Sequence, residues 1–290
     1  MSRLFAFGLG YSAQALAACL AAKGWKIAGT ARDQGKIERL AAKSYEVARF
    51  AGEPGNRELT KLLEGTTHLL HSIPPEPSGD PVLVHYREEI AAQGSLEWIG
   101  YLSTVGVYGD QQGRWVDETT EPAPNSERTE ARVAAERAWL DFGEEMGVPV
   151  QVFRLAGIYG PGRSVFDKLR AGTARRVKKD GQVFSRIHVE DIASVLQASM
   201  ARPRAGAIYN VADDEPAAPD EVVAYAAMLL GIEPPPEVAF ADADLSPMAR
   251  SFYEGRRRIG NARIKSELGV ALRYPTYREG LASMLAEQPS

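Results

Sequence analysis

The sequence has 290 residues, of which 44% are hydrophobic and 25% are charged, and its formal net charge is −4. This composition is typical of a globular protein with a buried core, and the lack of net positive charge gives no reason to expect nucleic acid or a membrane as a partner. The single cysteine, Cys19, cannot form a disulfide within the chain. A strand, a turn and a helix explain the apolar start better than a signal peptide does, so we expect a cytoplasmic protein.

Strands and helices alternate through the first part of the chain. The apolar segment 3–7 leads into glycines and then into an Ala/Leu-rich helix over 13–22, which stops at Gly24. The alternation continues with strands predicted over 26–31, 45–50, 68–73 and 96–103 and helices over 34–43, 57–64 and 81–93. Such a pattern requires a parallel sheet with helices on both faces.

The regular alternation ends after Ser103, where a loop carries Tyr108 and Glu118. Long loops on this type of sheet are often functional. Beyond the loop we predict a charged helix over 127–145, strands over 149–155 and 208–211, a strand and a helix within 183–200, a helix over 221–230 and two short helices within 260–285. The segment 157–162 is rich in turn residues. The basic run 175–179 (RRVKK) is expected to be a solvated loop, with contact to an anionic substrate as the alternative.

The turn after the first strand has the sequence GLGYSA over residues 8–13, which fits the pattern G-x-G-x-x-A between a buried strand and a helix. Gly8 would permit the tight turn, Gly10 would let a pyrophosphate approach the backbone, and Ala13 would allow close helix packing. The N-terminus of the helix attracts phosphate. This context favours a dinucleotide site over an ordinary glycine-rich turn.

The end of the second predicted strand, where Arg32 follows Thr30 and Ala31, indicates which dinucleotide is bound. Sites that select NAD usually place a carboxylate here to accept from the ribose hydroxyls, whereas the 2′-phosphate of NADP needs a cation. The guanidinium of Arg32 can bind that phosphate and stack on adenine, so we expect NADP. The alternative is NAD, with Arg32 in solvent and Asp33 on the ribose.

An ordered series of motifs makes the sequence resemble a known family. The series comprises the turn over 8–13, residues 101–110 (YLSTVGVYGD), Glu118, residues 153–155 (FRL), residues 159–162 (YGPG), residues 187–191 (IHVED) and the tail over 261–281. In this order the motifs are similar, over nearly the whole chain, to the extended short-chain dehydrogenase/reductase superfamily, which includes nucleotide-sugar epimerases and dehydratases. The expected fold is α/β, a doubly wound parallel sheet (Rossmann fold) with a smaller C-terminal substrate lobe. We expect the NAD(P)-binding domain over 1–160 and 183–211, and the substrate-binding lobe over 161–182 and 212–290.

The resemblance also implies a set of catalytic positions. In the family a Ser or Thr polarises the substrate oxygen, a Tyr transfers a proton, and a Lys lowers the pKa of that Tyr and holds the nicotinamide ribose. Thr104, with Ser103 beside it, matches the first role. Aligning the family pattern Lys-x-Ala-Ala-Glu on residues 132–136 places Arg132 at the Lys position and Arg128 at the Tyr position. Arginine stays protonated, so Arg128 can hold an anion but cannot transfer the proton. The sequence is therefore similar to the atypical branch of the superfamily.

Other side chains are candidates because loops at the carboxyl edge of such a sheet bind ligands. Tyr108 or Tyr159 could supply a phenol, and Glu118 could act as a base or contact the substrate; a packing or capping role is the alternative for each. His188 resembles a family position near the substrate lobe, with a structural histidine as the alternative. The two histidines of the strand over 68–73 have no Cys or carboxylate cluster beside them, so we expect no metal site.

These interpretations define the predicted site and function. The cofactor residues are Gly8, Gly10, Tyr11, Ser12, Ala13, Arg32 and Ser72; the catalytic residues are Thr104, Ser103, Tyr108, Arg128 and Arg132; the substrate residues are Glu118, Tyr159 and His188. The predicted function is an atypical NADP-dependent oxidoreductase or epimerase for a small, nucleotide-sugar-like substrate. The alternatives are a catalytically silent NADP(H) sensor or scaffold and a redox-neutral isomerase. The resemblance also implies a homodimer formed through the helices over 81–93 and 127–145.

Overall fold

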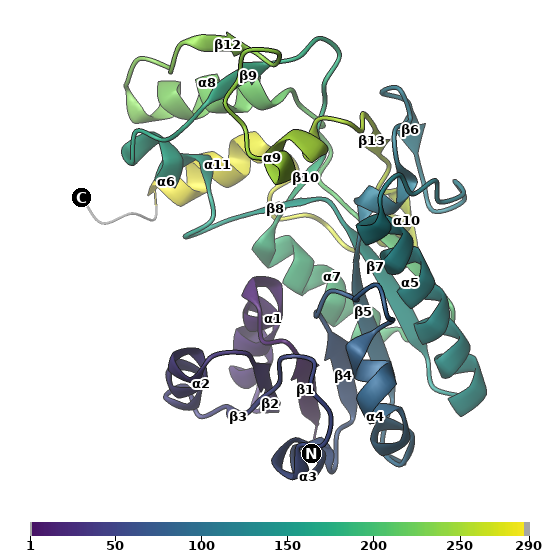
Figure 1. Ribbon diagram of the computed structural model, residues 1–290. Coiled ribbons are helices and arrows are strands. Elements are labelled where there is room, and N and C mark those ends of the chain that lie inside the picture. The colour runs from purple at the N-terminus through teal and green to yellow at the C-terminus, as the bar shows by residue number, and fades with distance from the viewer. Residues whose placement is uncertain (1, 287–290) are drawn as a thin grey trace.

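The computed structural model describes residues 2–286. Its centre is a seven-stranded parallel sheet with the strand order β11-β7-β5-β4-β1-β2-β3 (Figure 1). The strands are β1 (Arg3–Phe7), β2 (Lys26–Ala31), β3 (Glu46–Arg49), β4 (His68–His71), β5 (Trp98–Thr104), β7 (Val150–Leu155) and β11 (Ile208–Val211). Each lies where the sequence predicts a strand, so the doubly wound α/β fold is confirmed.

Helices cover both faces of the sheet, and an apolar core lies under each layer. One core is shared by α1 (Tyr11–Ala21), α2 (Gln34–Ala41) and α7 (Val189–Ala201), of which α1 and α7 pack together. The other core is shared by α3 (Arg57–Leu63), α4 (Pro81–Ala91) and α5 (Glu127–Met146). The strands of a sheet covered in this way are buried on both sides, which is why they appear in the sequence as short apolar runs.

A smaller lobe lies beyond one end of the sheet (Figure 1). Its own apolar cluster joins α6 (Val165–Arg170), α8 (Pro219–Leu230) and α11 (Tyr277–Ala286). Two short parallel pairs lie beside these helices, β8 (Gly157–Tyr159) with β10 (Arg186–His188) and β9 (Arg176–Lys178) with β12 (Glu237–Ala239). β8 and β10 fall in the ranges expected for the cofactor domain, and we propose that they be grouped with the lobe, whose apolar cluster includes Tyr159. The helix α9 (Pro247–Phe252) follows β12 along the chain.

The expectation of a solvated loop over 175–179 is wrong, because three of these residues form β9. Val177 is buried, while Arg176 and Lys178 on either side of it form ion pairs with Glu237 of β12 at 3.2 and 3.1 Å. Two of the four cations of this run are thus paired within the lobe, both with the carboxylate of Glu237.

The C-terminal tail returns to the sheet before it enters the lobe. A short pair joins β13 (Arg258–Ile259) to β6 (Trp115–Val116), and α10 (Ala262–Ser266) packs on β11. Ile264 and Leu268 are buried in the core shared by α1 and α7. We therefore propose that residues 258–272 be grouped with the cofactor domain and not with the substrate lobe.

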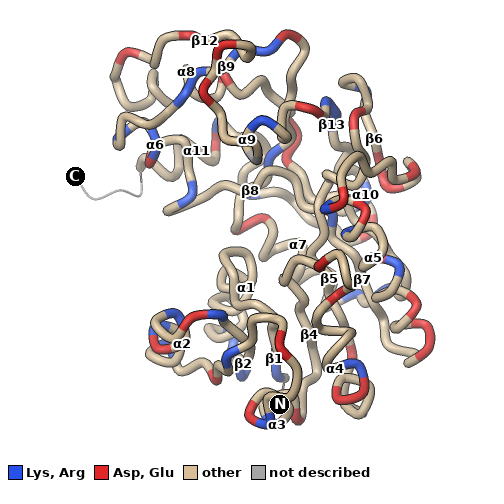
Figure 2. Tube along the Cα trace, in the orientation of Figure 1, with Lys and Arg blue, Asp and Glu red and all other residues tan. Residues whose placement is uncertain are grey.

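Lys, Arg, Asp and Glu residues of both signs are scattered along the sheet body and the lobe (Figure 2). Across residues 2–286, no helix is both long and apolar enough to cross a bilayer. The surface therefore shows no field that would select for a polyanion over the whole molecule.

Candidate cofactor and substrate site

The strand order reverses between β1 and β4, which is the position where open α/β sheets bind ligands. Gly8 follows β1 with a φ of 84°, a backbone conformation that favours glycine. The Gly8 N–H donates to Thr30 Oγ1 at 2.8 Å, and the Ser72 hydroxyl donates to the Gly8 carbonyl. Ser72, which was predicted to contact the cofactor, thus supports the turn itself. Thr30 also supports the turn, a role that the sequence did not predict.

The space above Gly10 is open. A Cβ built on Gly10 would have only the Gly8 carbonyl oxygen and Ser72 Oγ within contact range, each at 3.9 Å. Gly10 begins α1 without a side-chain cap, whereas α2, α3, α4 and α5 begin at capping side chains: Asp33, Asn56, Asp80 and Ser126. The first N–H groups of α1 therefore have no capping side chain, which fits a phosphate at this helix end.

The first turn of α1 contacts both the sheet and the lobe. Ser12 and Ala13 are buried, and Ala13 packs in the core under α1 and α7. The Tyr11 hydroxyl donates to the Pro161 carbonyl at 2.9 Å, and the Arg163 guanidinium carbon lies 5.8 Å from the centre of the Tyr11 ring. Burial raises the pKa of Tyr11 although Arg163 opposes the change. Tyr11 thus connects the glycine turn to the loop between β8 and α6.

A pocket opens where β2, β3 and β4 end, at the other side of the glycine turn. It is lined by Arg32, Phe50, Ala51, Gly52, Ile73, Pro74, Pro75, Glu76 and Pro81. Arg32 is exposed at this pocket, and in the part of the chain that the structure describes it forms no ion pair. Asp33 caps α2, because its Oδ1 accepts from the Lys36 N–H at 2.8 Å. One carboxylate oxygen is therefore engaged by the helix, while the Arg32 guanidinium is available to a ligand.

Thr104 lies at the carboxyl end of β5, where it caps the short helix η1 (Val105–Tyr108). Its Oγ1 accepts from the Gly106 N–H at 3.0 Å, which leaves the hydroxyl proton available to a substrate oxygen. The start of α5 packs against this turn: a Cβ on Gly106 would lie 3.3 Å from Thr104 Oγ1 and 3.4 Å from Thr129 Cγ2. Arg128 directly precedes Thr129 in the sequence, so it lies in the same turn of α5 that packs against the Thr104 turn.

Ser103 does not share the surroundings of Thr104, because successive side chains of a strand point to opposite faces. Its hydroxyl donates to Glu136, which also receives Arg154 with Nη2 2.7 Å from Oε2. Arg154 donates to the Tyr108 hydroxyl at 3.0 Å, and Tyr108 donates to Asn210 Oδ1 at 2.8 Å. This buried network joins β5, α5, β7 and β11. The one charged residue of strand β7, Arg154, was the signal of this network in the sequence.

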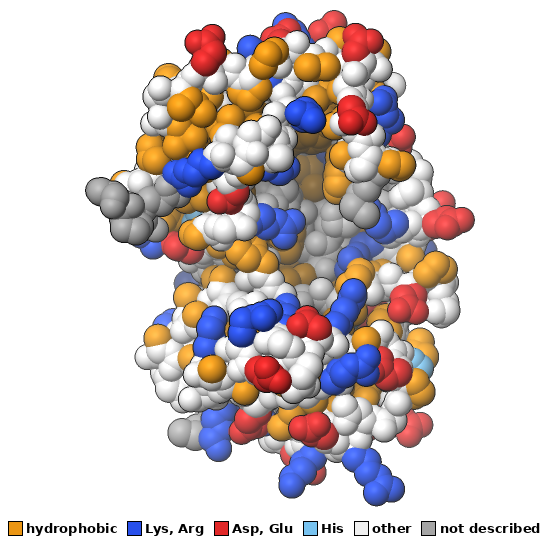
Figure 3. All heavy atoms as spheres, turned by 60° about the vertical axis from the view of Figure 1, so that its left-hand side comes forward, with side chains coloured by type: hydrophobic (Ala, Val, Ile, Leu, Met, Phe, Trp, Pro, Cys, Tyr) orange, Lys and Arg blue, Asp and Glu red, His pale blue; other side chains and the backbone are white. Residues whose placement is uncertain are grey.

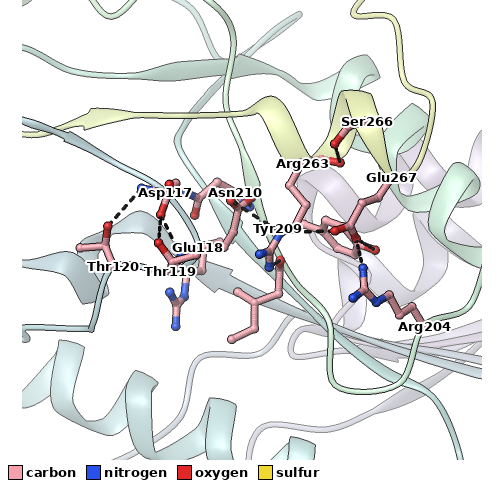
Figure 4. A network of polar contacts seen from close by, with 12 residues as sticks. Asp117, Glu118, Thr119, Thr120, Arg204, Tyr209, Asn210, Arg263, Ser266 and Glu267 are labelled. Carbon is pink, nitrogen blue, oxygen red and sulfur yellow. Dashed lines mark hydrogen bonds and ion pairs between the residues drawn. The ribbon is translucent and has the colours of Figure 1, made fainter.

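The candidate proton donors are enclosed by protein. Tyr108 is fully buried, and burial raises its pKa. Glu118 accepts from the Asn210 N–H at 2.8 Å and lies 4.0 Å from Arg263 Nε (Figure 4). Burial raises the pKa of Glu118 as well. Both side chains are thus hydrogen-bonded within the protein and shielded from solvent.

Tyr159 and His188 lie inside the lobe. The Tyr159 hydroxyl donates to the Thr276 carbonyl at 3.4 Å, and burial raises its pKa. His188 caps α7 through Nδ1, which accepts from the Glu190 N–H at 3.3 Å, and its ring centroid lies 4.1 Å from that of Tyr274. The structure brings these two aromatic rings together, 5.2 Å apart, but not beside Thr104.

Arg128 and Arg132 lie in the first two turns of α5. The guanidinium carbon of Arg128 lies 5.5 Å from the ring centre of Phe252 in α9. Arg132 Nη1 donates to the Tyr101 hydroxyl at 3.0 Å and to the Leu102 carbonyl at 3.1 Å. A hollow separates the lobe from the sheet body, with Lys and Arg side chains at its edges (Figure 3). The geometry thus offers one open surface, running between the glycine turn and the lobe, for a cofactor and a substrate.

Comparison with known proteins places this arrangement in a family. The model of the NAD dependent epimerase/dehydratase family matches residues 87–212. Protein YeeZ of Escherichia coli (strain K12) is 30% identical over 290 residues, which cover 95% of this chain and 97% of YeeZ. The chain belongs to the NAD-dependent epimerase/dehydratase family.

Solved structures agree with this assignment. A functionally unknown conserved protein from Silicibacter pomeroyi DSS is 51% identical, with a TM-score of 0.89 and 99% of both chains covered. MoeE5 in complex with UDP-glucose and NAD has a TM-score of 0.77 at 22% identity, covering 99% of this chain and 98% of MoeE5, and that likeness shows the shared fold. This family member carries arginines at the two helix positions where the resemblance leads one to expect Tyr and Lys.

Proposed function

We propose that the protein is an NADP-dependent oxidoreductase or epimerase for a small, nucleotide-sugar-like substrate, and that it works without a Tyr–Lys pair. The observation that carries the proposal is the glycine turn itself, where α1 begins without a side-chain cap and the space at Gly10 is open, and a pocket lined by Arg32 lies at the ends of the neighbouring strands. A dinucleotide needs an anion site, close backbone approach and an apolar slot in this order.

The cofactor would be held mainly by backbone. Gly8, Gly10 and the N–H groups of Ser12 and Ala13 would bind the pyrophosphate, with Tyr11 beside them and Ser72 bracing the turn. Arg32 would bind the 2′-phosphate as a charge-assisted fork. When bound, the dinucleotide supplies a centre that accepts or donates hydride. NAD, which is present in the MoeE5 complex, is the alternative cofactor, and Asp33 would then contact the ribose.

Thr104 would orient the reacting substrate oxygen, because its hydroxyl proton is not used within the η1 turn. Tyr108, Tyr159 and Glu118 are left out of the proposed proton route, since each is buried and bonded within the protein. Water bound beside Thr104 would exchange the proton with the cleft. The buried Ser103 would act through Glu136 to hold β5 against α5.

A catalytically silent NADP(H) sensor is the second candidate function. It is favoured by Arg128 and Arg132, because a guanidinium cannot be tuned into the pKa range of a proton-transfer group. A redox-neutral isomerase with a structural cofactor is a third candidate function, and it too is compatible with arginine at positions 128 and 132.

The test begins with calorimetric titration of NADPH and NADH into the native protein, where we expect NADPH to bind at least tenfold more tightly. The cofactor-bound protein is then incubated with a panel of nucleotide sugars, while nicotinamide absorbance and product masses are followed. Turnover that is lost in Thr104→Val supports the enzyme, and tight NADPH binding without turnover supports the sensor. Failure of both cofactors to bind would overturn the proposal.

We also propose a homodimer formed through the outer faces of α4 and α5. These helices are already braced against each other by an ion pair between Arg87 and Glu145, and Val84 of α4 is exposed. Light scattering of the native protein and of Val84→Glu tests this, and a native monomer would overturn it.

A further inference from the structure

Two arginines lie one helical turn apart near the N-terminal end of α5. Arg128 lies in the first turn of the helix and is exposed, and Arg132 is half-buried. Side chains at this spacing are neighbours on one face of a helix, and like charges there destabilise it. Within residues 2–286 neither arginine forms an ion pair with a carboxylate. The helix therefore carries an uncompensated positive pair.

The acidic residues of α5 do not relieve this charge. Glu136 follows Arg132 at the spacing that favours an ion pair, but its carboxylate is buried and receives Arg154 and Ser103 instead. Glu127 and Glu130 lie near Arg128 in the sequence, yet residues one or two positions apart on a helix do not face each other. The carboxylate of Glu136 is therefore paired with Arg154 and not with Arg132.

Aromatic rings hold both guanidinium groups in place. The Arg132 carbon lies 5.6 Å from the centre of the Tyr101 ring, and the Arg128 carbon lies 5.5 Å from that of Phe252. Arg132 Nη1 is used by Tyr101 and Leu102, while among the described residues its Nε and Nη2 make no hydrogen bond. A guanidinium over a ring can still donate in its own plane, so Nε and Nη2 of Arg132 and the donors of Arg128 remain for an oxyanion.

We propose that Arg128 and Arg132 form a clamp for an oxyanion of the substrate, a carboxylate or a phosphate, at the end of the cleft beside Thr104. The proposal rests on the proposed function in taking this cleft as the substrate site. The clamp narrows the substrate class of the proposed function to molecules that carry a negatively charged group next to the reacting oxygen. Arginine is suited to this role, since its fork matches both anions and it is charged at every working pH.

The test titrates inorganic phosphate and, separately, malonate into the NADPH-bound protein by calorimetry, so that the glycine turn is already filled. The phosphate and malonate arms distinguish the two anion sources. We expect saturable binding of at least one anion, weakened at least tenfold in Arg128→Gln and in Arg132→Gln. Arg137→Gln, on an exposed turn of the same helix, is the matched control and should change the affinity less than twofold.

The clamp can fail independently of the proposed function. If NADPH does not bind, the titrations are repeated on Gly10→Val, in which a side chain fills the phosphate space at the turn. Because Arg128 is exposed, Arg128→Gln decides the outcome if Arg132→Gln does not fold. Absence of saturable binding, unchanged affinity in Arg128→Gln, or an equal loss in Arg137→Gln would overturn the clamp.

Discussion

Two glycines of one turn have different physical roles. Gly8 adopts a φ of 84° and its missing Cβ avoids Ser72 and Ile73, so a substitution there would strain the fold. Gly10 has a φ of −75° that any residue can adopt, and the space around it is open. The fold therefore does not require the absence of a side chain at Gly10, whereas the proposed dinucleotide site does.

Gly10→Val should abolish binding of NADPH while the protein remains folded, because the new side chain occupies the space proposed for the pyrophosphate. The measurement is calorimetry, together with a thermal melt to confirm the fold. Gly94→Val, at another glycine with open space and no positive φ, is the control and should bind normally. Unchanged affinity in a folded Gly10→Val would remove the dinucleotide site from this turn.

Arg32 should decide between the two cofactors. A charge-assisted hydrogen bond contributes about 1.5–3 kcal/mol, or roughly tenfold to a hundredfold in affinity. Arg32→Ala should therefore weaken NADPH binding by that factor and change NADH binding little. Lys61→Ala, an exposed cation on α3, serves as the control. Equal losses for NADPH and NADH would show that Arg32 does not read the 2′-phosphate.

At the scale of elements, the sequence predicts the strands and turns that are determined by residues close together in the chain. The strand β1 is a short run of mostly apolar residues that ends at Gly8, and the glycine turn is a contiguous motif, so both could be identified in advance. The strand β9 could not, because only Val177 of Arg176–Lys178 is apolar and the cations are compensated by Glu237 from a distant segment.

The candidate site was predictable to a similar extent. Thr104 and the two arginines of α5 follow from aligned motifs, but the surroundings of Ser103 and Tyr108 depend on partners from separate elements. Glu136, Arg154 and Asn210 come from α5, β7 and β11, and only the folded sheet brings them together. A buried charge in β7 predicts that a partner exists, but it does not say which one.

The Glu136–Arg154 pair should matter for stability, since each side chain is only 3% exposed. Glu136→Gln would leave a buried guanidinium without its counter-charge and should lower the free energy of unfolding by about 3–5 kcal/mol. The double variant Glu136→Gln/Arg154→Met removes both charges and should recover much of this loss. Urea unfolding of the two variants measures the difference, and a double variant no more stable than Glu136→Gln would contradict the explanation.

At the scale of the whole molecule, the lobe joins the sheet body through polar segments that cross between them. The Asp213 N–H donates to the Arg186 carbonyl at 2.7 Å, directly after β11. The Asp191 carboxylate of α7 accepts from the N–H groups of Arg273 and Tyr274 at 2.7 and 3.1 Å. Any motion of the lobe relative to the sheet body would therefore require these segments to move. The protonation states of the Asp191 and Asp213 carboxyl groups in these segments affect the stability of the whole fold.

Asp213 is the most unusual group in this junction. Burial raises its pKa to about 8, although Arg186 opposes the shift. Its Oδ1 accepts from the Glu215 N–H at 3.3 Å, while within residues 2–286 its Oδ2 has no hydrogen-bond partner. An unfolded Asp has a pKa of about 3.9. Between these two values the unfolded chain has lost the proton and the folded protein retains it, so the stability contributed by neutral Asp213 falls as pH rises towards 8.

Asp213→Asn should therefore become more stabilising relative to the native protein as pH rises from 5 to 8, because the amide resembles the neutral carboxyl and cannot ionise. The gain in the free energy of unfolding should grow by roughly 1.4 kcal/mol for each pH unit in this interval. Urea unfolding at a series of pH values measures it, and Asp242→Asn, at an exposed carboxylate, should show no such trend. A difference between Asp213→Asn and the native protein that does not change with pH would mean that Asp213 is already ionised in the folded state, and that the junction between lobe and sheet carries a charge that Arg186 fully compensates.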